Sequence, residues 1–137
     1  MAGAKVGSAS AVVAGADRIR VFADIKKKHS AHAITSDVSL VETARAAELF
    51  LADGVIVTGP ASGEEASPDE VRNTAQAVRL PVLVGSGVSV QNLARFADAH
   101  GFIVGSSLKQ GGIWSNPLDR TAVESMARAF AKLTERL

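Results

Sequence analysis

Two short turns rich in glycine and serine carry the residues of this sequence best suited to binding a ligand. One turn follows the apolar run PVLV, and the other follows the run FIV. Glycine lets backbone N–H groups approach an anion closely, and serine hydroxyls add hydrogen-bond donors. Because such turns precede helices in parallel α/β proteins, the pair predicts one phosphate-binding cradle; turning a strand into a helix is the plainer role of the same residues. The turn residues are Gly85, Ser86, Gly87, Gly105, Ser106 and Ser107.

Charged side chains alternate along the first apolar run, IRVFADI, which predicts a strand over residues 19–25. Asp24, Lys26 and Lys28 fall on one face of this extended segment, and aliphatic residues fall on the other. At the mouth of a parallel barrel, these three side chains could orient substrate oxygens, move a proton or form a Schiff base. A structural ion pair among interior residues is the alternative interpretation.

Other polar residues follow the strand and turn segments. Thr58 and Gly59 end the run GVIVTG, and Lys109 follows the second turn, so all three could contact the same ligand. His29 and His32 have a spacing that could place two imidazoles on one metal ion, but no carboxylate at helical spacing completes a ligand set. We therefore predict no metal site and no cofactor.

The composition excludes several classes of protein. The chain has 137 residues, the length of one domain, with 47% hydrophobic and 21% charged residues, as in a folded soluble protein. Its net charge of +1 gives no general attraction to nucleic acid. It has no cysteine, and therefore no disulfide, thiolate nucleophile or cysteine-ligated metal. No apolar run approaches the roughly 18 residues that span a bilayer, so we predict a cytoplasmic protein without a membrane span.

Strand and helix signals alternate along the chain. Ser39 with Glu42 forms a capping-box pattern that opens the first helix, and a serine followed by a proline opens the second. Residues 1–17 are weakly patterned, and residues 18–137 form the predicted domain. The expected strands cover residues 19–25, 54–59, 82–84 and 102–104, and the expected helices begin at Ser39, Ser67, Ser89 and Asp119.

This alternation predicts an α/β fold with parallel strands and helical crossovers. Four βα units are half of a (β/α)8 TIM barrel, and glycine-rich turns after the last two strands match the place where such barrels bind phosphate. The charged face of the first strand also suits a barrel interior. We therefore favour a half-barrel, with an open doubly wound parallel sheet as the alternative.

Several short motifs in a fixed order resemble those of the BtpA family. The resemblance extends from about Ala16 to Ala131 but corresponds to only the C-terminal half of a typical family member. It implies a barrel of the ribulose-phosphate-binding kind and, from one cyanobacterial member, an association with photosystem I biogenesis. One departure is the segment PASG at 60–63, where we expect a further Thr-Gly. The motifs are ADIKKKHSAH, DGVIVTG, PVLVGSGV, Asn92, GFIVGSSLK, a following Gly-Gly and NPLDR.

Together, the pattern and the resemblance predict binding of a phosphorylated small molecule at the carboxyl-terminal mouth of the barrel, with the reaction left open. The resemblance also implies an alternative, a non-catalytic assembly factor for a photosystem I-type membrane complex that lies at the membrane periphery and acts through protein contacts. An inactive remnant of a longer protein is a third interpretation. Because a lone half-barrel exposes two edge strands, we predict a homodimer that completes the eight-stranded ring.

Overall fold

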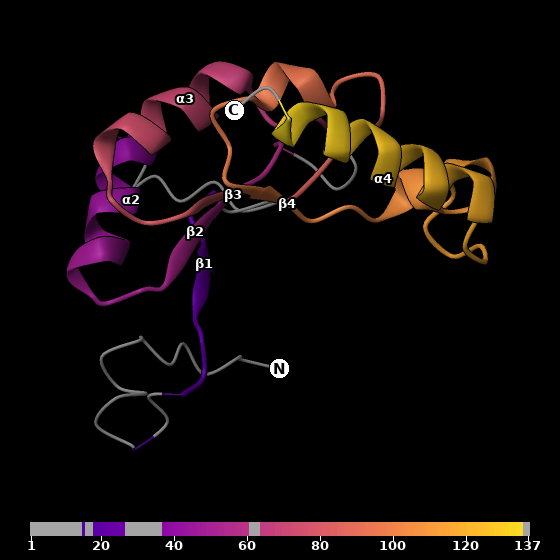
Figure 1. Ribbon diagram of the computed structural model, residues 1–137. Helices are drawn as coiled ribbons and strands as arrows, with labels where there is room; N and C mark the ends of the chain where they lie inside the picture. Colours follow the sequence, from indigo (N-terminus) through magenta and orange to yellow (C-terminus); the bar gives the residue numbers. More distant parts are fainter. Residues whose placement is uncertain (1–14, 16–17, 27–36, 61–63, 136–137) are drawn as a thin grey trace.

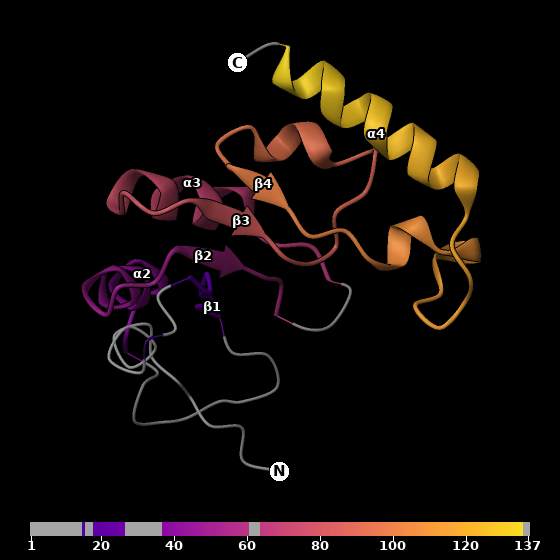
Figure 2. The ribbon, with the colours of Figure 1, turned by 60° about the horizontal axis from the view of Figure 1, so that its bottom comes forward.

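Four short parallel strands form the centre of the molecule. The computed structural model describes residues 15, 18–26, 37–60 and 64–135. The strands hydrogen-bond in the order of the sequence, and every neighbouring pair is parallel (Figures 1 and 2). A doubly wound sheet reverses its strand order at a switch point, whereas a barrel adds its strands in sequence, so the order agrees with a half-barrel. The strands are β1 (Phe22–Asp24), β2 (Gly54–Val57), β3 (Val82–Val84) and β4 (Gly101–Phe102).

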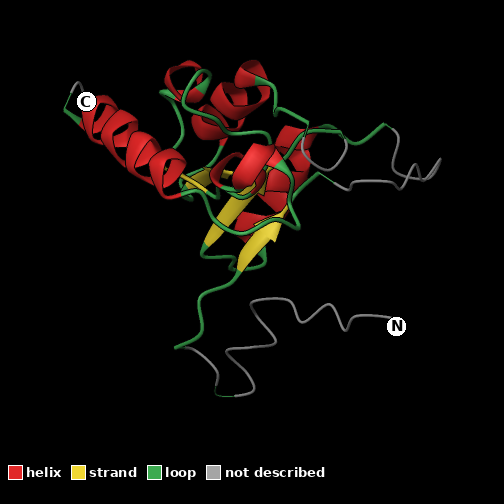
Figure 3. Ribbon diagram, turned by 90° about the vertical axis from the view of Figure 1, so that its right-hand side faces the viewer, coloured by secondary structure: helices red, strands yellow, loops and turns green. Residues whose placement is uncertain are grey.

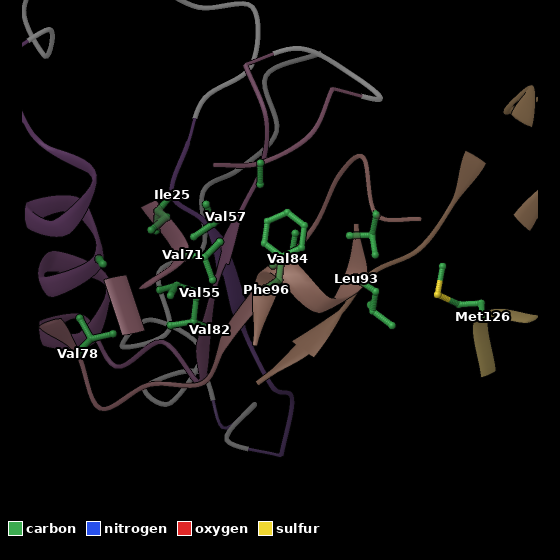
Figure 4. Packing of buried hydrophobic residues seen from close by; sticks show 13 residues of the cluster. Ile25, Val55, Val57, Val71, Val78, Val82, Val84, Leu93, Phe96 and Met126 are labelled. Atoms are coloured by element: carbon green, nitrogen blue, oxygen red, sulfur yellow. The ribbon is translucent and has the colours of Figure 1, made fainter. Parts of the chain in front are cut away.

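The helices pack on one face of the sheet, which we call the outer face (Figure 3). The valines of β2 and β3 on this face are fully buried, whereas the residues between them, Ile56 and Leu83, are only half-buried. The hydrophobic core therefore lies between the sheet and the helices, as Figure 4 shows. The buried valines are Val55, Val57, Val82 and Val84.

The two predicted N-terminal helix signals are confirmed. Helix α2 (Leu40–Leu49) begins with a capping box, in which the Ser39 hydroxyl accepts from the Glu42 N–H and the Glu42 carboxylate accepts from the Ser39 N–H. The Glu42 carboxylate accepts hydrogen bonds from the Ser39 N–H and also from the Ser39 hydroxyl, and these bonds, the backbone one first, lower the pKa of Glu42. Helix α3 (Pro68–Ala77) begins after Ser67, whose hydroxyl accepts from the Glu70 N–H.

The C-terminal helix is α4 (Arg120–Thr134), and Asp119 caps it by accepting from the N–H groups of its first turn. Met126 is the buried residue of this helix. Phe130 packs edge-to-face on Phe102 of β4, with ring centroids 6.1 Å apart, yet remains 43% exposed. Helix α4 is therefore less completely covered than the apolar stripe of its sequence predicts.

Four predicted elements differ from the observed ones, and one of them is β2, which ends at Val57 rather than at Gly59. Strands β1 and β4 are also shorter than expected because each lies at an edge of the sheet and, among the described residues, pairs with a strand on one side only. The third helix is a 3₁₀ helix, η2 (Leu93–Phe96), and the expected cap at Ser89 is wrong. The side chain of Asn92 forms this turn instead, accepting from the Ser89 N–H and donating to the Gly87 carbonyl.

Over the part of the chain that the structure describes, no helix is both long and apolar enough to cross a membrane.

Candidate functional site

The first Gly-Ser turn, after β3, is held by the protein's own hydrogen bonds. The Ser86 hydroxyl accepts from the Gly59 N–H at 2.6 Å and donates to the Glu64 carbonyl at 2.8 Å. Ser86 is only 8% exposed, and a Cβ on Gly87 would lie 2.5 Å from the Glu65 Cα. Because Gly87 has no side chain, the backbone of the loop between β2 and α3 can pack directly against the turn. The hydrogen bonds of the Ser86 hydroxyl then join that loop to the turn.

The second turn, after β4, is more open. Gly105 is exposed, and a Cβ built on it would have no atom within 4 Å. Ser106 begins the short 3₁₀ helix η3 (Ser106–Leu108). Among the described residues, the N–H groups of Ser106 and Ser107 have no hydrogen-bond acceptor. Backbone donors at this turn are therefore available to a ligand.

The two turns lie side by side, as their position after neighbouring parallel strands requires. The Ser107 hydroxyl donates to the Val88 carbonyl at 2.6 Å, which ties the second turn to the segment after the first. Its hydroxyl is therefore already engaged. Lys109 follows and is half-buried, and its backbone pairs in an antiparallel bridge with Leu118, closing the loop that leads to α4.

At the opposite edge of the sheet, the end of β1 brings polar groups together. The Asp24 carboxylate is exposed and accepts from the Lys26 N–H at 3.1 Å and from the Thr58 hydroxyl at 3.4 Å. Thr58, at 2% exposure, also donates to the Lys26 carbonyl at 3.3 Å. Asp24 and Thr58 thus lie together at the carboxyl ends of β1 and β2.

Lys26 makes an ion pair that the sequence pattern did not indicate. Its ammonium group lies 2.9 and 2.6 Å from the two carboxylate oxygens of Glu70, in the first turn of α3. Both side chains are partly buried. Glu70 was identifiable in principle, because α3 follows β2 and its N-terminus must lie at the carboxyl edge of the sheet. The other predicted residues of this segment, Lys28, His29 and His32, lie outside the described residues.

Among the described residues, no group of three or more His, Cys, Asp or Glu side chains could hold a metal ion. The polar groups at the carboxyl ends of the four strands include the exposed Asp24 carboxylate, the Lys26–Glu70 ion pair and the open N–H groups of the second turn. Such groups can orient a small anionic molecule. Their positions do not define a reaction.

Comparison with known proteins identifies relatives over most of the chain. A protein of Caenorhabditis elegans, described as uncharacterized and mitochondrial, is 54% identical over 104 residues, which are 76% of this chain and 38% of that protein. An uncharacterized protein of Methanocaldococcus jannaschii is 35% identical over 117 residues, 85% of this chain and 44% of that protein. The Photosystem I biogenesis protein BtpA of Synechocystis sp. is 30% identical over 116 residues, 83% of this chain and 40% of that protein.

The chain thus spans about two fifths of the length of these curated relatives. A sequence model of the BtpA family matches residues 6–132, nearly the whole chain. The resemblance inferred from the short motifs is confirmed by this match, and the chain belongs to the BtpA family.

Proposed function

We propose that this chain binds a phosphorylated small molecule at the carboxyl edge of its sheet. The phosphate would lie on the second turn, and the rest of the molecule would extend toward Asp24 and Lys26. The observation that carries this proposal is the open geometry at Gly105, with the adjacent N–H groups of Ser106 and Ser107 lacking acceptors among the described residues. Successive backbone donors of this kind can form an anion-binding concavity.

The first turn supports this site in a different way from the second. The Ser86 hydroxyl is occupied by Gly59 and Glu64, so Gly85, Ser86 and Gly87 would contribute the shape and backbone of one wall. The Gly59 N–H bonds to Ser86, and the Thr58 hydroxyl bonds to Asp24 and Lys26. The Lys109 ammonium group would add positive charge beside the phosphate. We assign no reaction to this site.

A Gly105→Asp variant tests the proposal. The open space at Gly105 accepts a side chain without a clash, and a carboxylate there would repel phosphate. We expect ribose 5-phosphate, but not ribose, to raise the melting temperature of the unmodified chain. At ten times the dissociation constant the ligand would stabilise the fold by about 1.4 kcal/mol, a shift of a few degrees. The Asp variant should show no shift.

The matched control is Gly105→Asn, which adds a side chain of the same size without charge. It should retain most of the response to ribose 5-phosphate. An equal shift in the Asp and Asn variants would contradict a phosphate site at this turn. So would the absence of any shift across a panel of sugar phosphates and inorganic phosphate.

A second candidate function is a non-catalytic assembly factor that acts through protein contacts. The printed description of the Synechocystis relative, a photosystem I biogenesis protein, favours it. A partner captured equally by the unmodified chain and by the Gly105→Asp variant would support it over the ligand site.

We extend the proposal to self-association, because four strands supply only half of a barrel mouth. The cytoplasmic location stays a prediction; the description of the worm relative places that protein in mitochondria.

A further inference from the structure

The inner face of the sheet, opposite the helices, is apolar and incompletely covered. Among the described residues it carries Phe22, Ile56 and Leu83 from β1, β2 and β3, Ile103 directly after β4, and the exposed Asp24 at the end of β1. Phe22 is 42% exposed and Ile103 is 48% exposed, while Ile56 and Leu83 are half-buried. Parallel sheets are normally covered on both faces. Apart from Asp24, this face is therefore as apolar as a protein core, but among the described residues no second layer of structure packs against it.

Glycines on the inner face indicate what kind of layer covers it. A Cβ on Gly54 would meet the Phe22 ring, one on Gly85 would meet the Ile56 side chain, and one on Gly101 would lie 2.9 Å from Leu83 Cδ2. Each large side chain thus lies across a glycine of the next strand. Alternation of large and small residues across neighbouring strands is how the interior of a closed barrel is filled. The inner face is therefore built as one half of a barrel interior.

Within the described part of the chain both edges of the sheet are unpaired, and they are complementary. The strand order leaves β1 at one edge and β4 at the other, as Figure 2 shows. A twofold axis along the barrel axis keeps all strands parallel. It therefore brings β1 of one copy beside β4 of the other, twice, and gives eight strands.

A pocket with a volume of about 390 Å³ lies beside β4. Its lining combines the apolar side chains of Phe102, Phe130 and Leu133 with the polar residues Asp98, His100 and Thr134. At the opposite edge, Ile19 precedes β1 and is 66% exposed. It shares the alternation of Ile25, which packs in the core on the helix side of the sheet. In a dimer, the Ile19 side chain would contact the apolar part of this lining, Phe102, Phe130 and Leu133.

We propose that a second copy of this chain closes the sheet into an eight-stranded ring. In this dimer β1 of each copy pairs with β4 of the other, Ile19 enters the pocket beside β4, and the two inner faces form one core. The inference rests on the self-association proposed above and is independent of the phosphate ligand.

Cross-linking between introduced cysteines tests this arrangement, since the chain has no cysteine of its own. Asp24→Cys and Ile103→Cys place thiols on the inner face at opposite edges of the sheet. Paired strands lie about 4.8 Å apart, which is within the Cα separation of a disulfide. We expect oxidation of a mixture of the two single variants to give a covalent dimer joining one of each. If β1 pairs with β4 of the other copy in a register shifted by two residues, Phe22→Cys rather than Asp24→Cys should form the disulfide with Ile103→Cys.

A matched pair of lysine variants provides the second measurement. Ile103→Lys puts a charge on the inner face, whereas Ile113→Lys changes an isoleucine of similar exposure, 52%, in the loop before α4. By analytical ultracentrifugation at 20 μM, the unmodified chain and Ile113→Lys should sediment as dimers, and Ile103→Lys as a monomer. If Ile103→Lys does not fold, the cross-linking result decides.

Three results would overturn the proposal. They are a folded monomer for the unmodified chain, a dimer unaffected by a folded Ile103→Lys variant, and no mixed disulfide with either Asp24→Cys or Phe22→Cys. A dimer without the mixed disulfide would leave self-association standing and reject this surface for it. None of these outcomes depends on whether ribose 5-phosphate binds.

Discussion

At the carboxyl ends of the strands, some side chains form hydrogen bonds that stabilise the fold, and others are free to contact a ligand. The hydroxyls of Ser86 and Ser107 are both engaged with backbone carbonyls, and the Lys26 ammonium group is engaged with Glu70. Asp24 is exposed and Gly105 is open. Residue type alone predicted all of these as ligand groups, but hydrogen-bond partners separate those that support the site from those that could contact a ligand.

Asp53 provides a prediction on pH at the same scale. Its carboxylate accepts from the Val21 N–H and from Arg20, each at 2.7 Å, and these hydrogen bonds, the Val21 backbone bond first, lower its pKa. A carboxyl group whose pKa is lower in the folded state contributes stability above its unfolded pKa of about 3.9. That contribution is lost as the pH falls through the folded pKa.

We therefore expect Asp53→Asn to destabilise the protein at pH 7 and to make its stability less dependent on pH between 7 and 3. Urea unfolding across this range measures both effects. The control is Asp69→Asn, whose carboxylate is 81% exposed and pairs only with Arg72 among the described residues. Equal pH profiles for Asp53→Asn and the unmodified chain would contradict the assignment.

At the scale of elements, the turn after β3 depends on the absence of a side chain at Gly87. Its φ of +67° is unfavourable for other residues, and a Cβ there would also meet the Glu65 backbone. Gly111 has a similar φ of +63°, but a Cβ there would have its nearest neighbour, an Ile113 methyl carbon, 4.0 Å away. A side chain would therefore strain the backbone at both positions, but only at Gly87 would it also clash with a neighbouring loop.

Gly111→Ala should cost about 1–2 kcal/mol from backbone strain alone. Gly87→Ala should cost more, because the loop between β2 and α3 must also move. The free energy of unfolding in urea measures both variants. Equal losses would show that the packing of this loop on the turn contributes little to stability.

The starts of α2, α3 and α4 could be predicted from the sequence because their caps are local, whereas the start expected at Ser89 was wrong. The alternation of strand and helix signals predicted the parallel fold. Ser39 with Glu42, and Ser67 with Pro68, form caps from residues within one turn, and both caps are observed. The lengths of β1 and β4 could not be predicted in this way, since they depend on the number of neighbours each strand has. The pairing of Lys26 with Glu70 joins residues 44 positions apart, so only the tertiary fold reveals it.

For the whole molecule, the central fact is a parallel sheet with a helical layer on one face and an apolar inner face on the other. The curated relatives are more than twice as long as the segment they share with this chain. The four strands described here follow one another as in half of a barrel. Whatever supplies the other half must bring parallel strands to both open edges at once. A second copy satisfies this condition without any further partner.

If a second copy closes the barrel, folding and association are coupled, and stability depends on protein concentration. Raising the concentration from 2 to 200 μM should stabilise the dimer by about 2.7 kcal/mol, which for about 270 residues corresponds to a rise of about 5 °C in melting temperature. The Ile113→Lys variant should show the same rise. The Ile103→Lys variant should melt at a lower temperature that does not change with concentration. Calorimetry over this range measures the effect, and a concentration-independent melting temperature for the unmodified chain would show that the half-barrel is stable alone.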